Sequence, residues 1–192
     1  TQERVETVPS GEQILFLHMH NAVGLQGQVV DVQNVQAQVP GDRVFADVQE
    51  GDLFFDDITW LANQGISTGW SNGDGTYRFE PLSNINRDAM AAFLYRMAGE
   101  PDVVLPETSP FSDVATDNQF YTEIVWAAQN EITTGWPDGT FRPTTPIARD
   151  AIAAFLYRYA ELDGLDLSGF PVPAESPFTD VAPGSQFYRE IT

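Results

Sequence analysis

The sequence predicts a mainly α-helical protein built from repeated helical hairpins, preceded by a short β-rich segment. A Phe-x-Asp-Val motif begins at Phe45, Phe111 and Phe178, at intervals of 66 and 67 residues. Such a fixed period along a chain indicates packed structural units. The stretches "ITWLANQGISTGW" and "IVWAAQNEITTGW" follow the first two motifs and match each other. The stretches "INRDAMAAFLYR" and "IARDAIAAFLYR" come next and carry apolar residues at helical spacing.

The motifs divide the chain into four parts. These are a β-rich segment at residues 1–42, a first repeat at 43–109, a second repeat at 110–176 and the start of a truncated third repeat at 177–192. Each complete repeat is expected to form a helix, a Gly-rich loop and a second helix. One such hairpin buries too little apolar surface to be stable alone, so neighbouring repeats are expected to pack together.

The second helix of each repeat is expected to bury one apolar stripe. Residues at the i, i+3, i+4 and i+7 positions form this stripe: Met90, Phe93, Leu94 and Met97 in the first repeat, and Ile152, Phe155, Leu156 and Tyr159 in the second. Two pairs are predicted to start these helices as cap and first helical residue, namely Ser83 with Asn84 and Thr145 with Pro146.

The first helix of each repeat is expected to carry a core tryptophan, Trp60 or Trp126, and Gly65 is a predicted helix end. The Phe-x-Asp-Val motifs are predicted to be structural. Their phenylalanines would anchor the chain, and the aspartates Asp47, Asp113 and Asp180 would cap the next turn.

Residues 1–42 contain stretches in which apolar and polar residues alternate, and they are rich in Val, Ile and Leu. Both features favour two or three strands. They could be the tail of a preceding β domain or a strand that serves assembly. His18 and His20 would share one strand face, as paired metal ligands do, but no third ligand is visible, so ordinary strand histidines are the preferred interpretation. Asp74 alone in "NGDGTY" does not make a calcium loop. No metal site and no cofactor are predicted.

Charge and composition exclude several function classes. The chain has 28 acidic residues against nine basic ones, all arginine, and a net charge of −19. This charge repels nucleic acids and anionic lipid surfaces. No apolar stretch approaches the roughly 20 residues that cross a bilayer, so membrane insertion is not expected. Zero cysteines exclude thiol nucleophiles, and no Ser/His/Asp arrangement or nucleotide-binding glycine motif appears, so no enzyme is predicted.

Taken together, "FADV…GISTGW…DGTYRF…INRDAMAAFLYR" and its second copy resemble the S-layer homology (SLH) domain of bacterial surface proteins, in a style similar to actinobacterial exoproteins. The resemblance covers about residues 44–192. It implies a three-repeat, pseudo-threefold helical module that anchors its protein non-covalently to cell-wall polysaccharide, often one bearing a pyruvyl ketal. The usual "TRAE"-like signature reads "NRDA" and "ARDA" here, so only Arg87 and Arg149 carry over cleanly.

Six residues are predicted to contact a polysaccharide: Arg87, Arg149, Trp70, Trp136, Gly69 and Gly135. The two arginines fall in first turns of predicted helices, where free N–H groups favour a carboxylate, and the resemblance supports this role. Internal salt bridges are the alternative for them, and hairpin packing is the alternative for the tryptophans. Two further matched arginine pairs, Arg78 with Arg142 and Arg96 with Arg158, are expected to brace the loop or helix end, with ligand contact as the alternative.

The predicted function is anchoring at the bacterial cell surface through an acidic, pyruvylated or otherwise charged, secondary cell-wall polysaccharide. One alternative is a structural subunit of a surface lattice or filament, in which copies of the chain bind each other. Another is the anchoring tail of a wall-active or polysaccharide-degrading exoenzyme whose catalytic domain precedes Thr1.

Overall fold

The computed structural model describes residues 5–7, 13–15 and 45–192, and the chain divides into two compact units, Thr1–Ala37 and Gln38–Thr192. In the first unit, β1 (Val5–Thr7) pairs antiparallel with β2 (Gln13–Leu15). The β2 strand falls in a stretch predicted to be strand. His18 and His20 lie outside the described residues.

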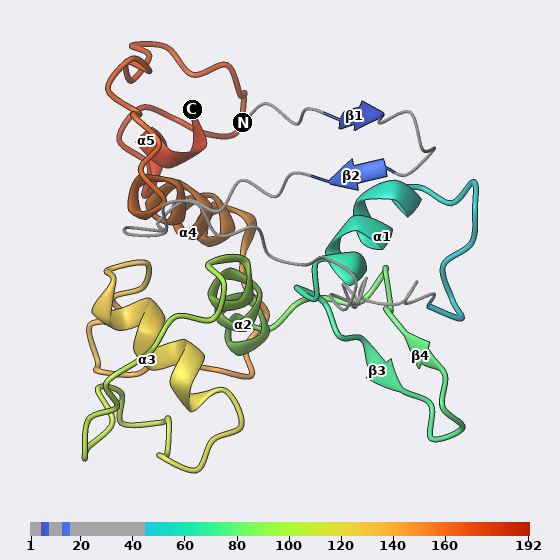
Figure 1. Ribbon diagram of the computed structural model, residues 1–192. Helices are drawn as coiled ribbons and strands as arrows, with labels where there is room; N and C mark the ends of the chain where they lie inside the picture. Colours follow the sequence, from blue (N-terminus) through green and yellow to red (C-terminus); the bar gives the residue numbers. More distant parts are fainter. Residues whose placement is uncertain (1–4, 8–12, 16–44) are drawn as a thin grey trace, which may run out of the picture. The chain divides into compact units, whose positions relative to one another are not determined.

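The second unit is helix-rich (Figure 1). Its elements are α1 (Phe55–Asn63), β3 (Trp70–Ser71), β4 (Tyr77–Arg78), α2 (Arg87–Met97), α3 (Tyr121–Gln129), α4 (Arg149–Leu162) and α5 (Tyr188–Ile191). The β3 and β4 strands form an antiparallel hairpin, with Trp70 opposite Arg78. The mainly helical class is therefore confirmed for the described residues, while the pseudo-threefold arrangement and the repeat boundaries stay predictions.

The starts of the second helices differ from the prediction. The α2 and α4 helices begin at Arg87 and Arg149, and neither N-cap residue makes a side-chain cap. At α2, the N–H groups of Arg87 and Asp88 instead donate to the carbonyl oxygens of Thr145 and Pro143, both at 3.1 Å. The turn of the next repeat thus replaces the local cap that Ser83 was expected to provide.

The end of the first helix agrees with the prediction. The α1 helix stops at Asn63, Gln64 is its C-cap, and Gly65 follows with a φ of 70°. Glycine adopts this left-handed conformation without the steric penalty that a side chain brings.

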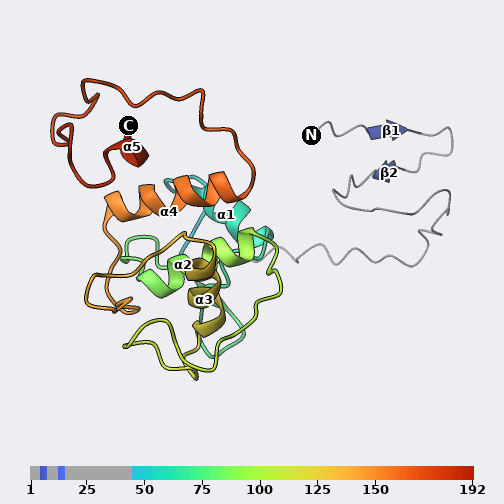
Figure 2. The same ribbon diagram turned by 90° about the vertical axis from the view of Figure 1, so that its left-hand side faces the viewer.

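The two core tryptophan predictions have different outcomes. Trp126 on α3 is 4% exposed and packs edge-on against Tyr95 of α2, with ring centroids 5.5 Å apart. Figures 1 and 2 show α2 lying against α3. Trp60 is 52% exposed, so its assignment to the core is wrong. Among the described residues, no aromatic ring covers Trp60 as Tyr95 covers Trp126.

The apolar stripe is confirmed for Met90, Leu94 and Phe155, which are buried. It is wrong for Leu156, which is 44% exposed although it matches Leu94 in the repeat. The two helices have different neighbours, since α2 packs against the full-length α3 and α4 packs against the four-residue α5.

The Phe-x-Asp-Val motif is structural in the first two repeats, where Phe45 and Phe111 are buried, whereas Phe178 is exposed. Its aspartates do not cap the next turn. The carboxylate of Asp47 accepts the N–H groups of Phe79 and Glu80, and Asp113 accepts those of Phe141 and Arg142, all at 2.8 Å. Each aspartate therefore fixes the far end of its Gly-rich loop.

Substitution of Gly135 tests the close packing of this loop. A Cβ at Gly135, whose φ is +67°, would lie 2.5 Å from Cε1 of Phe111 and 2.7 Å from the Thr140 oxygen. We expect Gly135→Ala to lower the free energy of unfolding by about 3 kcal/mol, because overpacking adds to backbone strain.

Gly139→Ala is the matched control in urea unfolding followed by circular dichroism. Gly139 has a φ of +78° but nothing within 4 Å of its Cβ position, so a loss of only about 1 kcal/mol is expected. Equal losses in the two variants would contradict the role assigned to Phe111.

Candidate functional site

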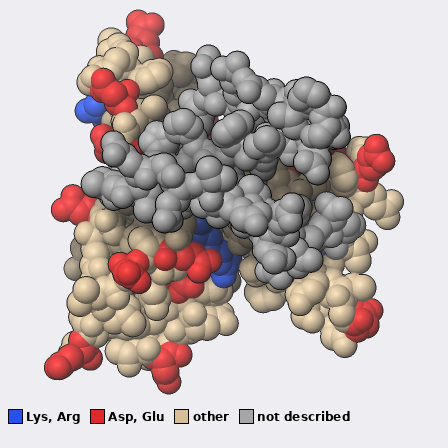
Figure 3. Space-filling view, viewed as in Figure 1, with Lys and Arg blue, Asp and Glu red and all other residues tan. Residues whose placement is uncertain are grey.

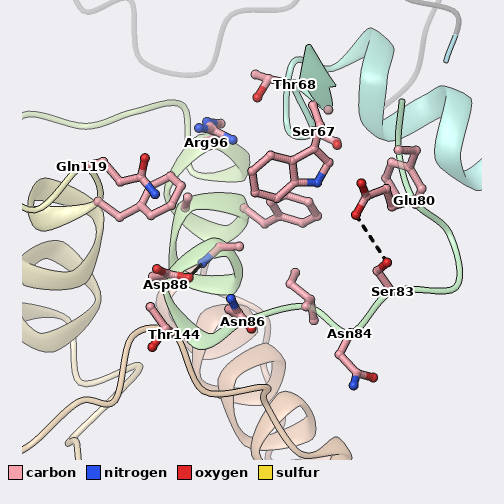
Figure 4. A pocket seen from close by; sticks show the side chains of 18 of the residues that line it. Ser67, Thr68, Glu80, Ser83, Asn84, Asn86, Asp88, Arg96, Gln119 and Thr144 are labelled. Carbon is pink, nitrogen blue, oxygen red and sulfur yellow. Dashed lines mark hydrogen bonds between the residues drawn. The ribbon is translucent and has the colours of Figure 1, made fainter. Parts of the chain in front are cut away.

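A pocket of about 440 Å³ lies beside α2 (Figure 4). Its walls come from the Gly-rich loop of the first repeat, from α2 and from the segment before α3. The lining residues are Ser67, Thr68, Gly69, Trp70, Phe79, Glu80, Pro81, Ser83, Asn84, Ile85, Asn86, Asp88, Ala89, Ala92, Phe93, Arg96, Gln119, Phe120 and Thr144. Two of the six predicted site residues, Gly69 and Trp70, are among them.

The pocket combines an aromatic surface with polar groups around it. Trp70 is 58% exposed, so it does not fill the hairpin interior as the alternative interpretation required. In Figure 4, Arg96 and Gln119 lie on one side of the pocket, and Glu80 and Ser83 lie on the other. An indole face with hydrogen-bonding groups nearby suits a ring that is apolar on its face and polar at its edge, as a sugar is.

Gly69 permits the loop to pass close to the core. Its φ is +63°, and a Cβ there would run into the ring of Phe45 and lie 2.8 Å from the carbonyl oxygen of Arg78. The turn that presents Trp70 therefore requires a glycine before it.

Positive charge is scarce on this protein, and the acidic side chains are spread over the face seen in Figure 3, where arginine shows at few places. In the pocket, Arg96 donates from Nη1 to the carbonyl oxygen of Ile66 at 3.1 Å and has no carboxylate partner among the described residues. Glu80 is already paired, since its Oε1 lies 2.6 Å from Nε of Arg78. Arg96 is therefore a cation with donors left for a ligand.

Arg87 lies between the first two repeats. Its side chain is buried, its Nε donates to the carbonyl oxygen of Phe141 at 2.7 Å, and its guanidinium lies 4.8 Å from the Phe141 ring centroid. Burial and the nearby Arg142 lower the pKa of this guanidinium, and Asp113 opposes that change. The free N–H groups expected beside Arg87 are absent, because the turn of the second repeat accepts them. The salt-bridge alternative also fails, since the partner is a carbonyl oxygen.

Arg149, the counterpart of Arg87, is exposed at the start of α4, and its side chain has no hydrogen-bond or ion-pair partner among the described residues. Gly135 repeats the close approach of Gly69, here to Phe111. Trp136 is 43% exposed, and the Arg142 guanidinium lies 4.0 Å from its ring centroid. The structure therefore brings Trp70 and Gly69 into one pocket and places Arg149 and the second tryptophan elsewhere.

The sequence favoured a bracing role for Arg96 over ligand contact, and it did not mark Gln119 or Asn84 as site residues. The bracing contact is present in both repeats. Arg96 donates to the carbonyl oxygen of Ile66, and its counterpart Arg158 donates to that of Ile132, at 3.1 Å in each case. The repetition of Arg96 at Arg158 was the one signal that could have marked it. Gln119 and Asn84 come from separate repeats, and both line the pocket in a unit where α2 packs against α3.

Residues 5–7, 13–15 and 45–192 contain neither a candidate metal site nor a membrane-spanning helix. No group of three or more His, Asp or Glu side chains there could hold a metal ion. The Oδ1 of Asp74 accepts the N–H and hydroxyl of Thr76, which makes it an ordinary turn residue. No helix in these residues is long and apolar enough to span a membrane.

The two matched arginines should contribute unequally to stability. We expect Arg87→Ala to lower the free energy of unfolding by about 2–4 kcal/mol, because it leaves the Phe141 carbonyl without its donor and removes buried packing. Arg149→Ala should change it by no more than about 0.5 kcal/mol, as for other exposed positions. Chemical denaturation of both variants measures this, and equal effects would contradict the placement of Arg87.

The buried carboxyl of Asp88 should make stability depend on pH. Burial raises the pKa of Asp88 above its ordinary value of 3.8, although the N–H of Ala89 donates to it at 2.7 Å. The folded chain thus holds the proton to higher pH than the unfolded chain does. The stability from this group is complete below pH 3.8 and is lost as the pH rises through the raised value.

Asp88→Asn, which keeps the acceptor oxygen but cannot ionise, isolates this effect. Its free energy of unfolding relative to the unaltered chain should increase as the pH rises from 4 to 7, as measured by urea denaturation at several pH values. A difference that does not change with pH would show that Asp88 titrates alike in both states.

Part of the chain matches a known family. A family model for the S-layer homology domain matches residues 110–153, from the turn before Phe111 through α3 and the Gly-rich loop into α4. No curated protein matches the chain. The recognition of S-layer homology repeats is therefore confirmed for this region, and the actinobacterial style stays a prediction.

Proposed function

Because the chain carries an S-layer homology domain at residues 110–153, we propose that it anchors a surface protein by binding an acidic secondary cell-wall polysaccharide in the pocket beside α2. Domains of this family are non-catalytic modules that hold proteins on the cell wall through such polymers. A cell-surface location and a role other than catalysis accord with this family.

The observation that carries the proposal is that Trp70 and Arg96 line the same pocket. The indole face of Trp70 would stack on a sugar ring, and Arg96 would receive a carboxylate such as that of a pyruvyl ketal. Gln119 and Asn84 offer hydrogen bonds to hydroxyl groups. In a chain with a net charge of −19, an acidic polymer needs such a local cation to overcome general repulsion.

The other predicted site residues have distinct proposed roles. Gly69 and Gly135 give the turns that present the two tryptophans their backbone shape. Arg87 would act indirectly, by holding the second repeat against α2 and so fixing the pocket wall. Arg149 and Trp136 would form part of a second contact with the same polymer.

We also propose the pseudo-threefold arrangement for the complete module. The second helix of one repeat packs against the first helix of the next, as α2 does with α3 and α4 with α5. A third repeat that followed the same rule would continue the ring of contacts.

Binding to bacterial wall sacculi tests the proposed function. Purified chain should sediment with sacculi and should fail to do so after the secondary polysaccharide is stripped chemically. Trp70→Ala should weaken binding at least about tenfold, which corresponds to about 1.4 kcal/mol, because it removes the stacking surface. Trp60→Ala is the matched control, since Trp60 is also exposed but does not line the pocket.

Equal losses in the two tryptophan variants would place the binding surface outside the pocket. A chain that ignores sacculi but sediments by itself would instead favour the structural subunit of a lattice or filament. Binding that survives removal of the polysaccharide would mean that another wall component is recognised.

A further inference from the structure

The first two repeats carry opposite charges at one matched position. The alignment by "DGTYR" and "DGTFR" pairs Arg78 with Arg142, but the contacts of the motif aspartates pair Glu80 with Arg142 instead. The N–H of Glu80 donates to Asp47, and that of Arg142 donates to Asp113, at 2.8 Å in each case. The predicted equivalence of Arg78 and Arg142 is therefore wrong.

Backbone geometry supports the new equivalence. Glu80 and Arg142 both adopt a left-handed conformation, with φ of 62° and 61°. Their carbonyl oxygens accept the N–H groups of Ser83 and Thr145, which lie three residues later in each case. The Asp-Gly-Thr turn lies two residues further from Glu80 in the first repeat than from Arg142 in the second. This difference accounts for part of the four extra residues in the first loop.

Glu80 and Arg142 differ in whether they cover the tryptophan of their own repeat. Glu80 pairs with Arg78 and leaves Trp70 exposed within the pocket. Arg142 places its guanidinium 4.0 Å from the ring centroid of Trp136, and its Nη2 lies 2.9 Å from Oδ2 of Asp138. One ring face of Trp136 is thus already covered.

We propose that Arg142 makes the second repeat the weaker sugar site by covering Trp136, and that the residue at this matched position determines which repeat receives the polymer first. This inference rests on the proposed function and assigns its primary site to the first repeat. A sugar ring that stacks on the covered face of Trp136 must first displace Arg142, whereas Trp70 requires no such displacement.

Two further contacts support this difference between the repeats. Asp138, which holds Arg142, also accepts hydrogen bonds from the N–H and hydroxyl of Thr140, and these bonds together with that from Arg142 lower its pKa to about 2. On α4, Arg158 is the counterpart of Arg96. Its Nη2 lies 3.8 Å from Oε1 of Glu190, and its guanidinium carbon lies 5.5 Å from the ring centroid of Phe187. The cation that would receive a carboxylate in the second repeat therefore already has an acidic neighbour.

The experiment follows the two tryptophans separately in the full chain. Indole N–H resonances of ¹⁵N-labelled protein are assigned with Trp70→Phe and Trp136→Phe. The protein is then titrated with an N-acetylhexosamine methyl glycoside bearing a 4,6-pyruvyl ketal. The 4,6-isopropylidene glycoside, which replaces the carboxylate by a methyl group, is the neutral control.

In the unaltered chain, the Trp70 resonance should respond at a concentration about tenfold lower than the Trp136 resonance does, as expected when a cation–π contact and an exposed ion pair must be broken. Arg142→Asn should move the Trp136 response to a lower glycoside concentration, towards that of Trp70. Asparagine tolerates the left-handed backbone at this position, so this variant keeps the turn. Glu80→Arg should weaken the Trp70 response, and Glu80→Gln separates the loss of the carboxylate from the gain of a guanidinium.

Equal responses of the two tryptophans in the unaltered chain would overturn the inference, as would an Arg142→Asn variant that leaves the Trp136 response weak. If either occurs while the chain still sediments with wall sacculi, the proposed function stands and only this inference fails. If neither tryptophan responds and sacculi are not bound, both fail together.

Discussion

The joint between α2 and the turn of the second repeat is the constraint on which the rest of the helical unit depends. The first N–H groups of a helix have no partners within the helix, and at α2 those of Arg87 and Asp88 are accepted by Thr145 and Pro143. The buried guanidinium of Arg87 adds a bond to Phe141 in the same turn. Since these partners lie more than 50 residues away in the chain, the helix start is a tertiary feature. The joint also sets the wall of the pocket that α2 shares with Gln119 and Thr144.

The sequence allowed the hairpins to be predicted because their signals are local. Apolar spacing predicted the buried face of α2, and Gly65 predicted the end of α1. Burial of Trp126 and exposure of Trp60 could not be distinguished, because the two residues occupy matched positions and differ only in what packs on them. Ser83 and Thr145 had the right chemistry for caps, but neither α2 nor α4 has a side-chain cap, and at α2 the turn of the second repeat takes that role. The prediction of the loop register was wrong for a different reason. The Asp-Gly-Thr turn is held by its own local hydrogen bonds in both repeats, so it does not report its distance from the residues that Asp47 and Asp113 bind.

The candidate site also combines residues with a local sequence signal and residues whose role depends on tertiary neighbours. Trp70 and Gly69 were identifiable because the Gly-Trp pair recurs in both repeats, and the glycine in each pair approaches the core closely. Arg87 and Arg149 look alike in sequence, yet one is buried in a joint and the other is exposed. Arg96 and Arg158 also look alike in sequence, and Arg96 differs in the structure because it lacks a carboxylate partner among the described residues. Charge in this protein therefore has to be interpreted through its neighbours, and a repeated arginine does not identify a repeated role.

The hairpin of β3 and β4 has a consequence for how such repeats diversify. Its base is held by Asp47, while the glycines at its tip, Gly73 and Gly75, have nothing within 4 Å of their Cβ positions. Length can therefore change at the tip without disturbing the core, as the four extra residues of the first repeat illustrate. The same property makes residues 72–76 a permissive position for an epitope or a fluorophore, displayed on the surface while the aromatic base of the loop keeps its geometry.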